Sequence, residues 1–187
     1  MRLIAVLFTA IALLFVLQIG GGRQTSAALA QTGDGTVNCG VNTAQLWPDS
    51  QETALLAQIN ARRTSLGLQP FALSYTLQRA ALWKSSDMAI HHNVNHDDSV
   101  ARDAEHRLLD CGYPNSDAET GEDLAAGYPD ANATFALWES SPDHYGNLIN
   151  PDYIAVGLKR VYAGDNDQYG WYWTIVFASQ LDWPLGG

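Results

Sequence analysis

The last third of the chain contains two apolar runs that a short polar segment separates. The run Tyr153–Tyr162 alternates in polarity, and the run Tyr169–Ala178 is rich in aromatic and β-branched residues. These residue types favour β-strands, and the polar segment 163–168 between them is typical of a turn. The pattern predicts an antiparallel hairpin whose second strand is buried.

The residues before the hairpin have helical patterns instead. Segments 52–63 and 75–92 place apolar side chains at helical spacing, and Ser74 is positioned to cap the second of them. Two shorter segments, 101–111 and 131–139, have helical character as well. Helices followed by a hairpin predict an α+β sandwich in which helices cover a small antiparallel sheet.

The amino terminus has the features of a secretory signal. Met1-Arg2 gives a short positive start, residues 3–19 are almost wholly apolar, and Ala28-Leu29-Ala30 is a signal peptidase site. We expect cleavage after Ala30 and a secreted protein without a stable membrane span. The alternative is an N-terminal membrane anchor, because the apolar run is at the short limit of what crosses a bilayer.

The remaining chain has the size of one ordinary domain. Residues 31–50 are polar and rich in turn formers, so we expect a mobile lead-in that is tied down at Cys39. Residues 51–180 form the predicted domain, and residues 181–187 form a short tail.

The chain is strongly acidic, with a formal net charge of −10 at pH 7. An acidic surface repels the phosphate backbone of nucleic acids and the headgroups of anionic lipids. We therefore expect no nucleic acid partner and no binding to an anionic membrane surface.

The two cysteines, Cys39 and Cys111, both follow the predicted cleavage site. An even number of cysteines in an oxidising compartment indicates a disulfide. The bridge would close a loop of about 70 residues and stabilise the fold by about 4 kcal/mol in the chain-entropy model. The alternative is two free thiols, which oxidise readily outside cells.

Histidines are the side chains in this chain best suited to chemistry. His91, His92 and His96 lie close together in the sequence, whereas His106 and His144 stand apart. The sequence lacks the metalloprotease motif H-E-x-x-H, the serine hydrolase motif G-x-S-x-G and a phosphate-binding glycine loop. We interpret His91, His92 and His106 as solvated surface residues.

Three segments are informative when they are taken together. They are V-N-H at 94–96, G-E-D-L-A at 121–125 and W-E-S-S-P-D-H-Y-G-N-L-I at 138–149. In this order they resemble the CAP superfamily, which includes cysteine-rich secretory proteins, antigen 5 and pathogenesis-related 1. The similarity is to its bacterial SCP-like extracellular branch, whose approximate motifs are M-A-x(6)-S-H, G-E-N-I-A and W-x-x-S-P-G-H-x-x-N-I-L. The resemblance covers about residues 51–178.

The resemblance implies an α-β-α sandwich with a central cleft. Two histidines and two glutamates line this cleft in the family, and several members bind a divalent cation there. Carried over residue by residue, His96, Glu122 and His144 match the first histidine, the first glutamate and the second histidine.

The chain departs from the family pattern at two positions. The second glutamate falls on Ser141 and is missing, and the nearby Glu139 points to a different side of its helix. The family motif G-E-N is G-E-D here, which places Asp123 beside the implied site.

Three interpretations of His96, Glu122 and His144 remain open. Two imidazoles and a carboxylate are a plausible metal-binding set, with Zn²⁺ or another divalent cation as the implied cofactor. Alternatively, the three side chains form a hydrogen-bonded polar cluster that holds helix, strand and loop together. In the third interpretation a bound metal activates water for hydrolysis, although the missing second glutamate removes the obvious general base.

We expect a secreted CAP domain that acts mainly by binding, rather than an enzyme, with a lipid or an extracellular protein as its ligand. One alternative is a divalent-metal-dependent hydrolase that acts on peptide or lipid. Another is a lipid or sterol carrier, in which the aromatic run 171–173 lines an apolar pocket. Strand alternation places part of that run in the core.

Overall fold

The computed structural model describes residues 39–114 and 117–185. The predicted signal segment 1–30 and the first part of the lead-in lie outside the described residues. Within the two described ranges, every helix is too short or too polar to traverse a lipid bilayer.

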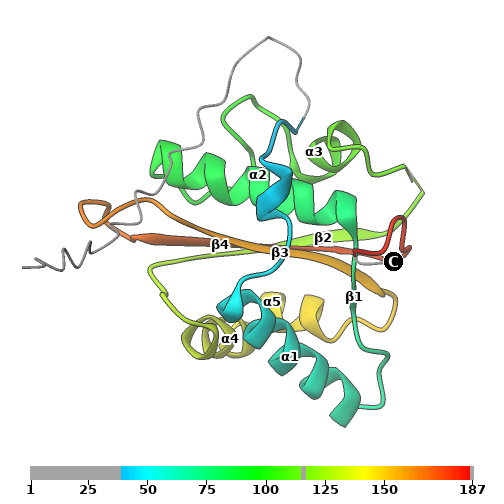
Figure 1. Ribbon diagram of the computed structural model, residues 1–187. Helices are drawn as coiled ribbons and strands as arrows, with labels where there is room; N and C mark the ends of the chain where they lie inside the picture. Colours follow the sequence, from blue (N-terminus) through cyan, green and yellow to red (C-terminus); the bar gives the residue numbers. More distant parts are fainter. Residues whose placement is uncertain (1–38, 115–116, 186–187) are drawn as a thin grey trace, which may run out of the picture.

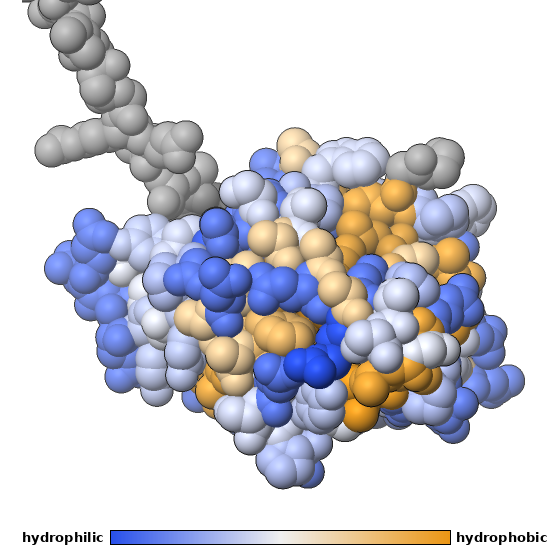
Figure 2. Space-filling view, turned by 90° about the horizontal axis from the view of Figure 1, so that it is seen from below, coloured by the Kyte–Doolittle hydropathy of each residue, from blue (hydrophilic) through white to orange (hydrophobic). Residues whose placement is uncertain are grey.

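Two layers of helices enclose a four-stranded sheet (Figure 1). Helices α2 and α3 cover one face, and helices α1, α4 and α5 cover the other. Seen from the side of this second layer, hydrophilic residues cover much of the surface and apolar patches lie between them (Figure 2). This arrangement confirms the predicted α+β sandwich. The elements in chain order are η1 (Thr43–Gln45), α1 (Ser50–Ser65), β1 (Ala72–Leu73), α2 (Tyr75–His91), α3 (Ala104–Asp110), β2 (Thr120–Ala126), α4 (Ala131–Ser140), α5 (Pro142–Leu148), β3 (Ala155–Tyr162) and β4 (Trp171–Ala178).

The predicted hairpin is the centre of the sheet. Strands β3 and β4 pair antiparallel from Ala155 opposite Ala178 to Tyr162 opposite Trp171. Strand β2 pairs antiparallel with the other side of β4. Because the strand order is β1-β3-β4-β2, β2 forms one edge of the sheet, and β3 is exposed at the other edge beyond the short β1.

The expectation of a purely antiparallel sheet is wrong for its shortest strand. Ala72 and Leu73 pair parallel with Ala155 and Val156, so the sheet is mixed. Parallel neighbours need a long crossover connection, and here four helices and strand β2 lie between the two strands in the chain. A two-residue strand carries too little pattern to reveal its direction in the sequence.

Helix α2 packs so closely on β3 that only glycine fits at one position. A Cβ atom on Gly157 would lie 2.1 Å from the main-chain carbonyl of Leu77. A glycine in a strand interior often marks such a close approach of two backbones. This contact explains the glycine in the segment A-V-G-L at 155–158, and it fixes α2 against the centre of the sheet.

Side-chain caps set the starts of the two long helices. Asp49 accepts hydrogen bonds from the amides of Gln51 and Glu52, and the Glu52 carboxylate accepts one from the Asp49 amide at 2.8 Å. This reciprocal pair is a capping box. At the second helix, Ser74 accepts from the Leu77 amide, as the sequence predicted.

Two helices differ from the sequence expectations. The third helix starts at Ala104 and not near Ala101, because Asp103 caps it and Ala101 has a left-handed φ of 64°. Helix α5 was not among the predicted elements, since its seven residues include Gly146 and Asn147, which are poor helix formers.

The described part of the lead-in packs on the domain. Leu46 is fully buried, and its carbonyl accepts a hydrogen bond from Gln78 Nε2 at 3.0 Å. The aromatic run divides in a similar way between core and surface. Tyr172 and Trp173 are fully buried, whereas Trp171 lines a surface pocket.

Candidate functional site

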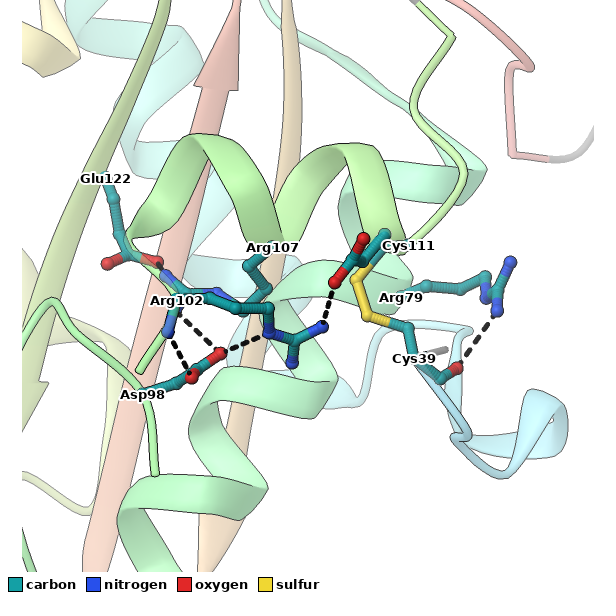
Figure 3. The surroundings of a disulfide bond; sticks show 8 residues. Cys39, Arg79, Asp98, Arg102, Arg107, Cys111 and Glu122 are labelled. Carbon is teal, nitrogen blue, oxygen red and sulfur yellow. Dashed lines mark hydrogen bonds and ion pairs between the residues drawn. A yellow bond between two sulfur atoms is a disulfide. The ribbon is translucent and has the colours of Figure 1, made fainter. Parts of the chain in front are cut away.

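A disulfide ties the lead-in to the end of helix α3. Cys39 and Cys111 are bonded, which confirms the predicted pairing (Figure 3). Both residues are buried, and Arg79 donates a hydrogen bond to the Cys39 carbonyl at 3.0 Å. The bridge therefore holds helix α3 in place, and Arg107 of this helix reaches toward strand β2.

A row of ion pairs runs from the end of α3 to strand β2 (Figure 3). Arg102 bonds Asp110 at 3.0 Å and Asp98 at 2.8 Å. Arg107 lies 3.6 Å from the same Asp98 carboxylate and forms a close ion pair with Glu122. Because Asp98, Arg107 and Glu122 are all buried, these pairs hold the Glu122 carboxylate in one position.

The Glu122 carboxylate also contacts a histidine from the loop after α2. The Nδ1 atom of His96 lies 3.0 Å from Glu122 Oε1, and the His96 carbonyl accepts a hydrogen bond from Arg107 at 3.2 Å. The Glu122 side chain is 2% exposed, whereas that of His96 is 59% exposed. The imidazole therefore lies at the surface over a buried carboxylate.

The next residue of the strand faces the opposite layer of helices. Side chains alternate along a strand, so Asp123 points away from Arg107 and toward α5. There Asn147 donates a hydrogen bond to Asp123 Oδ1 at 2.7 Å. His144 lies one turn before Asn147 and therefore on the same side of the helix.

These side chains together form what we call the β2-edge site: His96, Glu122, Asp123 and His144. The structure brings His96 and Glu122 into direct contact. His144 lies on α5 and makes no hydrogen bond to either of them within residues 39–114 and 117–185. The hydrogen-bonded cluster of all three residues is thus not formed.

Two polar atoms of the site are buried without a partner in the described part of the chain. They are His144 Nδ1 and Asp123 Oδ2. A buried polar atom without a hydrogen bond is costly, and such atoms in native proteins mark an unseen water, an ion or a functional group.

The titration behaviour of the site follows from burial and from these contacts. Burial raises the pKa of Asp123 to about 7. The hydrogen bond to Glu122 raises the pKa of His96. Burial and then the nearby charge of His96 lower the pKa of His144. The contacts of the site therefore favour the charged form of His96 and the neutral form of His144.

A divalent cation does not fit the Glu122 carboxylate as it is arranged here. One oxygen of Glu122 bonds His96 and the other bonds Arg107, whose guanidinium would repel a cation. Across residues 39–114 and 117–185, no group of three or more His, Cys, Asp or Glu side chains is placed to hold a metal ion. A metal site at His96, Glu122 and His144 stays a prediction.

The remaining candidates lie away from the site. Glu139 pairs with Arg62 of α1, and Ser141 precedes α5 as its cap residue. His91, His92 and His106 are exposed at the surface.

Sequence reasoning missed two residues that shape the site, Arg107 and Asn147. Arg107 carried no signal, because an arginine in a short helix is ordinarily exposed. Asn147 did carry one, since the family motif W-x-x-S-P-G-H-x-x-N-I-L includes an asparagine at this position.

The chain is similar to proteins from several bacteria. The family model described as the cysteine-rich secretory protein family matches residues 56–177. The uncharacterized protein YkwD of Bacillus subtilis is 27% identical over 126 residues, which cover 66% of this chain and 48% of that protein. The chain thus spans about half the length of this curated relative.

Two solved structures share the fold at lower identity. An outer surface protein of Borrelia burgdorferi is 23% identical with a TM-score of 0.60, over 70% of this chain and 95% of that one. An extracellular protein of Bacillus anthracis that contains an SCP domain is 23% identical with a TM-score of 0.58, over 67% of this chain and 39% of that one.

Proposed function

Because the chain belongs to the cysteine-rich secretory protein family, the CAP family, we propose that it works outside the cytoplasm as a binding domain whose ligand contacts the β2-edge site. The names of similar proteins support the location, since one is an outer surface protein and another an extracellular protein. The predicted signal segment 1–30 and the disulfide agree with export.

One observation carries the proposal. His144 Nδ1 and Asp123 Oδ2 are buried polar atoms that lack partners within the described residues, beside the exposed imidazole of His96. A ligand that supplies hydrogen bonds to these atoms removes their desolvation cost on binding. The ligand class is therefore a polar molecule or chain segment with both donors and acceptors.

The neighbouring ion pairs suit binding better than chemistry. Glu122 is bonded by both Arg107 and His96, so its carboxylate is fixed in position. A fixed site loses little conformational entropy when a ligand binds, which favours affinity.

The test is cosedimentation of the purified protein with cell envelopes of the organism that produces it. We expect the His144→Ala variant to lose on the order of tenfold in retention, as a truncated central contact does. His106→Ala is the control, because His106 is exposed on α3 and contacts Asp103 outside the site. Equal retention of the parent and His144→Ala at unchanged melting temperatures contradicts the proposal.

The predicted metal has a separate test. Zinc titration by calorimetry compares the parent with His96→Ala and His144→Ala. Binding that both variants lose would place the cation at this site and would require Arg107 to leave Glu122. An absence of binding in all three proteins leaves the site metal-free.

A second candidate function, a hydrolase, is favoured by Asp123. A carboxyl group with a pKa of about 7 can act as a general base near neutral pH. It would take the place of the second glutamate that the chain lacks. Hydrolysis of labelled casein or a p-nitrophenyl ester that Asp123→Asn abolishes, and that Asp143→Asn retains, would support this function. Activity that survives Asp123→Asn would exclude it.

A further inference from the structure

A pocket of about 720 Å³ lies at the opposite edge of the sheet from the β2-edge site. The lead-in, the second half of α2 and the end of β3 form its walls. We call it the β3-edge pocket, and its main apolar side chains are Trp47, Leu82, Ala89, Ile90, Val161 and Trp171. Its volume is within the range of pockets that bind small molecules or short peptide segments.

One edge of β3 faces this pocket, and most of the main-chain groups on that edge already have hydrogen-bond partners. At the start of β3, the main-chain groups that point away from β4 pair with the segment of strand β1. There the Val156 carbonyl accepts a hydrogen bond from the Ser74 amide at 3.0 Å. Beyond β1, side chains accept hydrogen bonds from the next two amides of β3 that point away from β4. The Leu158 amide donates to Gln78 Oε1 at 2.6 Å, and the Arg160 amide donates to Glu52 Oε1 at 2.7 Å.

The edge is open at the next outward residue, Tyr162. The Ala163 amide bonds the Gly170 carbonyl, and the carbonyl of Trp171 bonds the Gly127 amide. Tyr162 and Trp171 are therefore a pair without mutual hydrogen bonds, in which the Tyr162 amide and carbonyl point away from β4. Within residues 39–114 and 117–185, neither group has a hydrogen-bond partner.

The charges of the pocket are neutralised within its own walls. Lys159 bonds Glu52 at 2.6 Å, and Arg160 bonds Asp49 at 2.7 Å. The lining therefore offers no unpaired cation to an anion, and the net charge of −10 repels anionic ligands. The exposed Asp165, just beyond Tyr162, favours a basic group at that end.

Two exposed apolar side chains flank the open edge. Trp47 is 61% exposed and Ile90 is 45% exposed, and both line the pocket. Large exposed apolar side chains beside a concave surface are typical of interaction sites. A strand edge gives main-chain hydrogen bonds, and a pocket beside it accepts alternate side chains of an added strand.

We infer that the β3-edge pocket binds a short, extended, neutral or basic peptide segment of another protein as an added strand beside Tyr162. The peptide main chain bonds the Tyr162 amide and carbonyl. One apolar side chain of the peptide packs against Leu82, Ala89 and Ile90. This inference is independent of the β2-edge site, which lies at the other edge of the sheet.

The test uses a capped peptide of alternating lysine and valine, followed by ¹⁵N NMR of the full chain. We expect shifts of the Tyr162 and Val161 amides and of the Trp47 indole. The same peptide with every main-chain amide N-methylated should bind on the order of tenfold more weakly, because it lacks main-chain donors. A glutamate-valine peptide should be weaker as well.

Protein variants give the second arm of the test. Trp47→Ala and Ile90→Glu should each weaken binding on the order of tenfold. Trp183→Ala is the matched control, since Trp183 is 70% exposed and lies outside the pocket. Peptide binding that moves no amide of β3, that survives N-methylation, or that Trp183→Ala weakens as much as Trp47→Ala overturns the inference. Tight uptake of a fatty acid that displaces the peptide would likewise overturn it. If a variant fails to fold, the comparison of the two peptides on the unmodified protein decides.

Discussion

Glu122 and Asp123 are neighbours in the sequence, yet their carboxylates lie on opposite faces of strand β2. Glu122 is buried among the charges of Arg107 and His96, whereas Asp123 is buried with the neutral Asn147 and an unpartnered oxygen. Two adjacent carboxyl groups thus have very different environments. The titration of His96 and of Asp123 is the most direct way to test the arrangement of the site.

The contact between Glu122 and His96 predicts a histidine pKa that one substitution changes. The hydrogen bond to Glu122 is the largest cause of the raised pKa of His96, so Glu122→Gln should lower that pKa. Proton NMR of the histidine ring measures it. The pKa of His106, which Asp103 raises, should not change in the same variant.

The same substitution removes the charge partner of a buried arginine. We expect Glu122→Gln to reduce the free energy of unfolding by about 3 kcal/mol, because the buried Arg107 loses the carboxylate of its close ion pair and Asp98 lies farther away, at 3.6 Å. The histidine titration must therefore be done well below the melting temperature of the variant. A His96 pKa that stays raised in the folded variant would show that the hydrogen bond to Glu122 is not its cause.

Asp123 predicts a loss of stability as pH rises. Its pKa is raised from 3.8 to about 7 in the folded protein, so the folded state binds more protons than the unfolded state between these values. The free energy of unfolding should therefore decrease from about pH 4 to pH 7, by up to about 4 kcal/mol from this group.

The variant Asp123→Asn isolates this effect. The amide keeps an oxygen for Asn147 but does not ionise, so the stability of the variant relative to the parent should increase between pH 5 and pH 8. Urea unfolding at the two pH values gives the comparison. A difference between variant and parent that is equal at both pH values would show that Asp123 ionises normally in the folded state.

The long periodic segments allowed most of the fold to be predicted from the sequence. Helix α2 and the hairpin of β3 and β4 have patterns that burial requires, and the structure confirms both. The direction of β1 and the existence of α5 were not predictable, because each element is short. Their conformation depends on contacts with β3 and β2 that the local sequence does not show.

The candidate site was only partly predictable. The family resemblance identified His96, Glu122 and His144, and the structure places the first two in contact. The resemblance could not show that Arg107 bonds the second oxygen of Glu122, since the two residues come from different elements. Nor could the resemblance show that His144 makes no hydrogen bond to Glu122 within the described residues, because a motif gives an order of residues and not the contacts that each makes.

We expect the disulfide to stabilise the folded protein by reducing the conformational entropy of the unfolded chain. The double variant Cys39→Ser, Cys111→Ser should lose about 4 kcal/mol of unfolding free energy, because the bridge closes a long loop in the unfolded chain. Urea unfolding of the parent before and after reduction gives the same comparison without substitution. Equal midpoints of the oxidised and reduced parent would mean that the bridge does not constrain the unfolded state.

At Gly157 we expect a single added methyl group to have the most severe effect on stability. In Gly157→Ala the new Cβ would lie 2.1 Å from the Leu77 carbonyl, which belongs to a helix backbone and cannot move alone. Helix α2 must shift from the sheet, so we expect a loss of at least about 3 kcal/mol or a failure to fold. Gly146→Ala is the control, because no atom lies within 4 Å of its added Cβ and alanine favours a helix by about 0.5–1 kcal/mol. Melting temperatures of the two variants should therefore move in opposite directions. A stable Gly157→Ala variant with an unchanged melting temperature would contradict the close packing of α2 on β3.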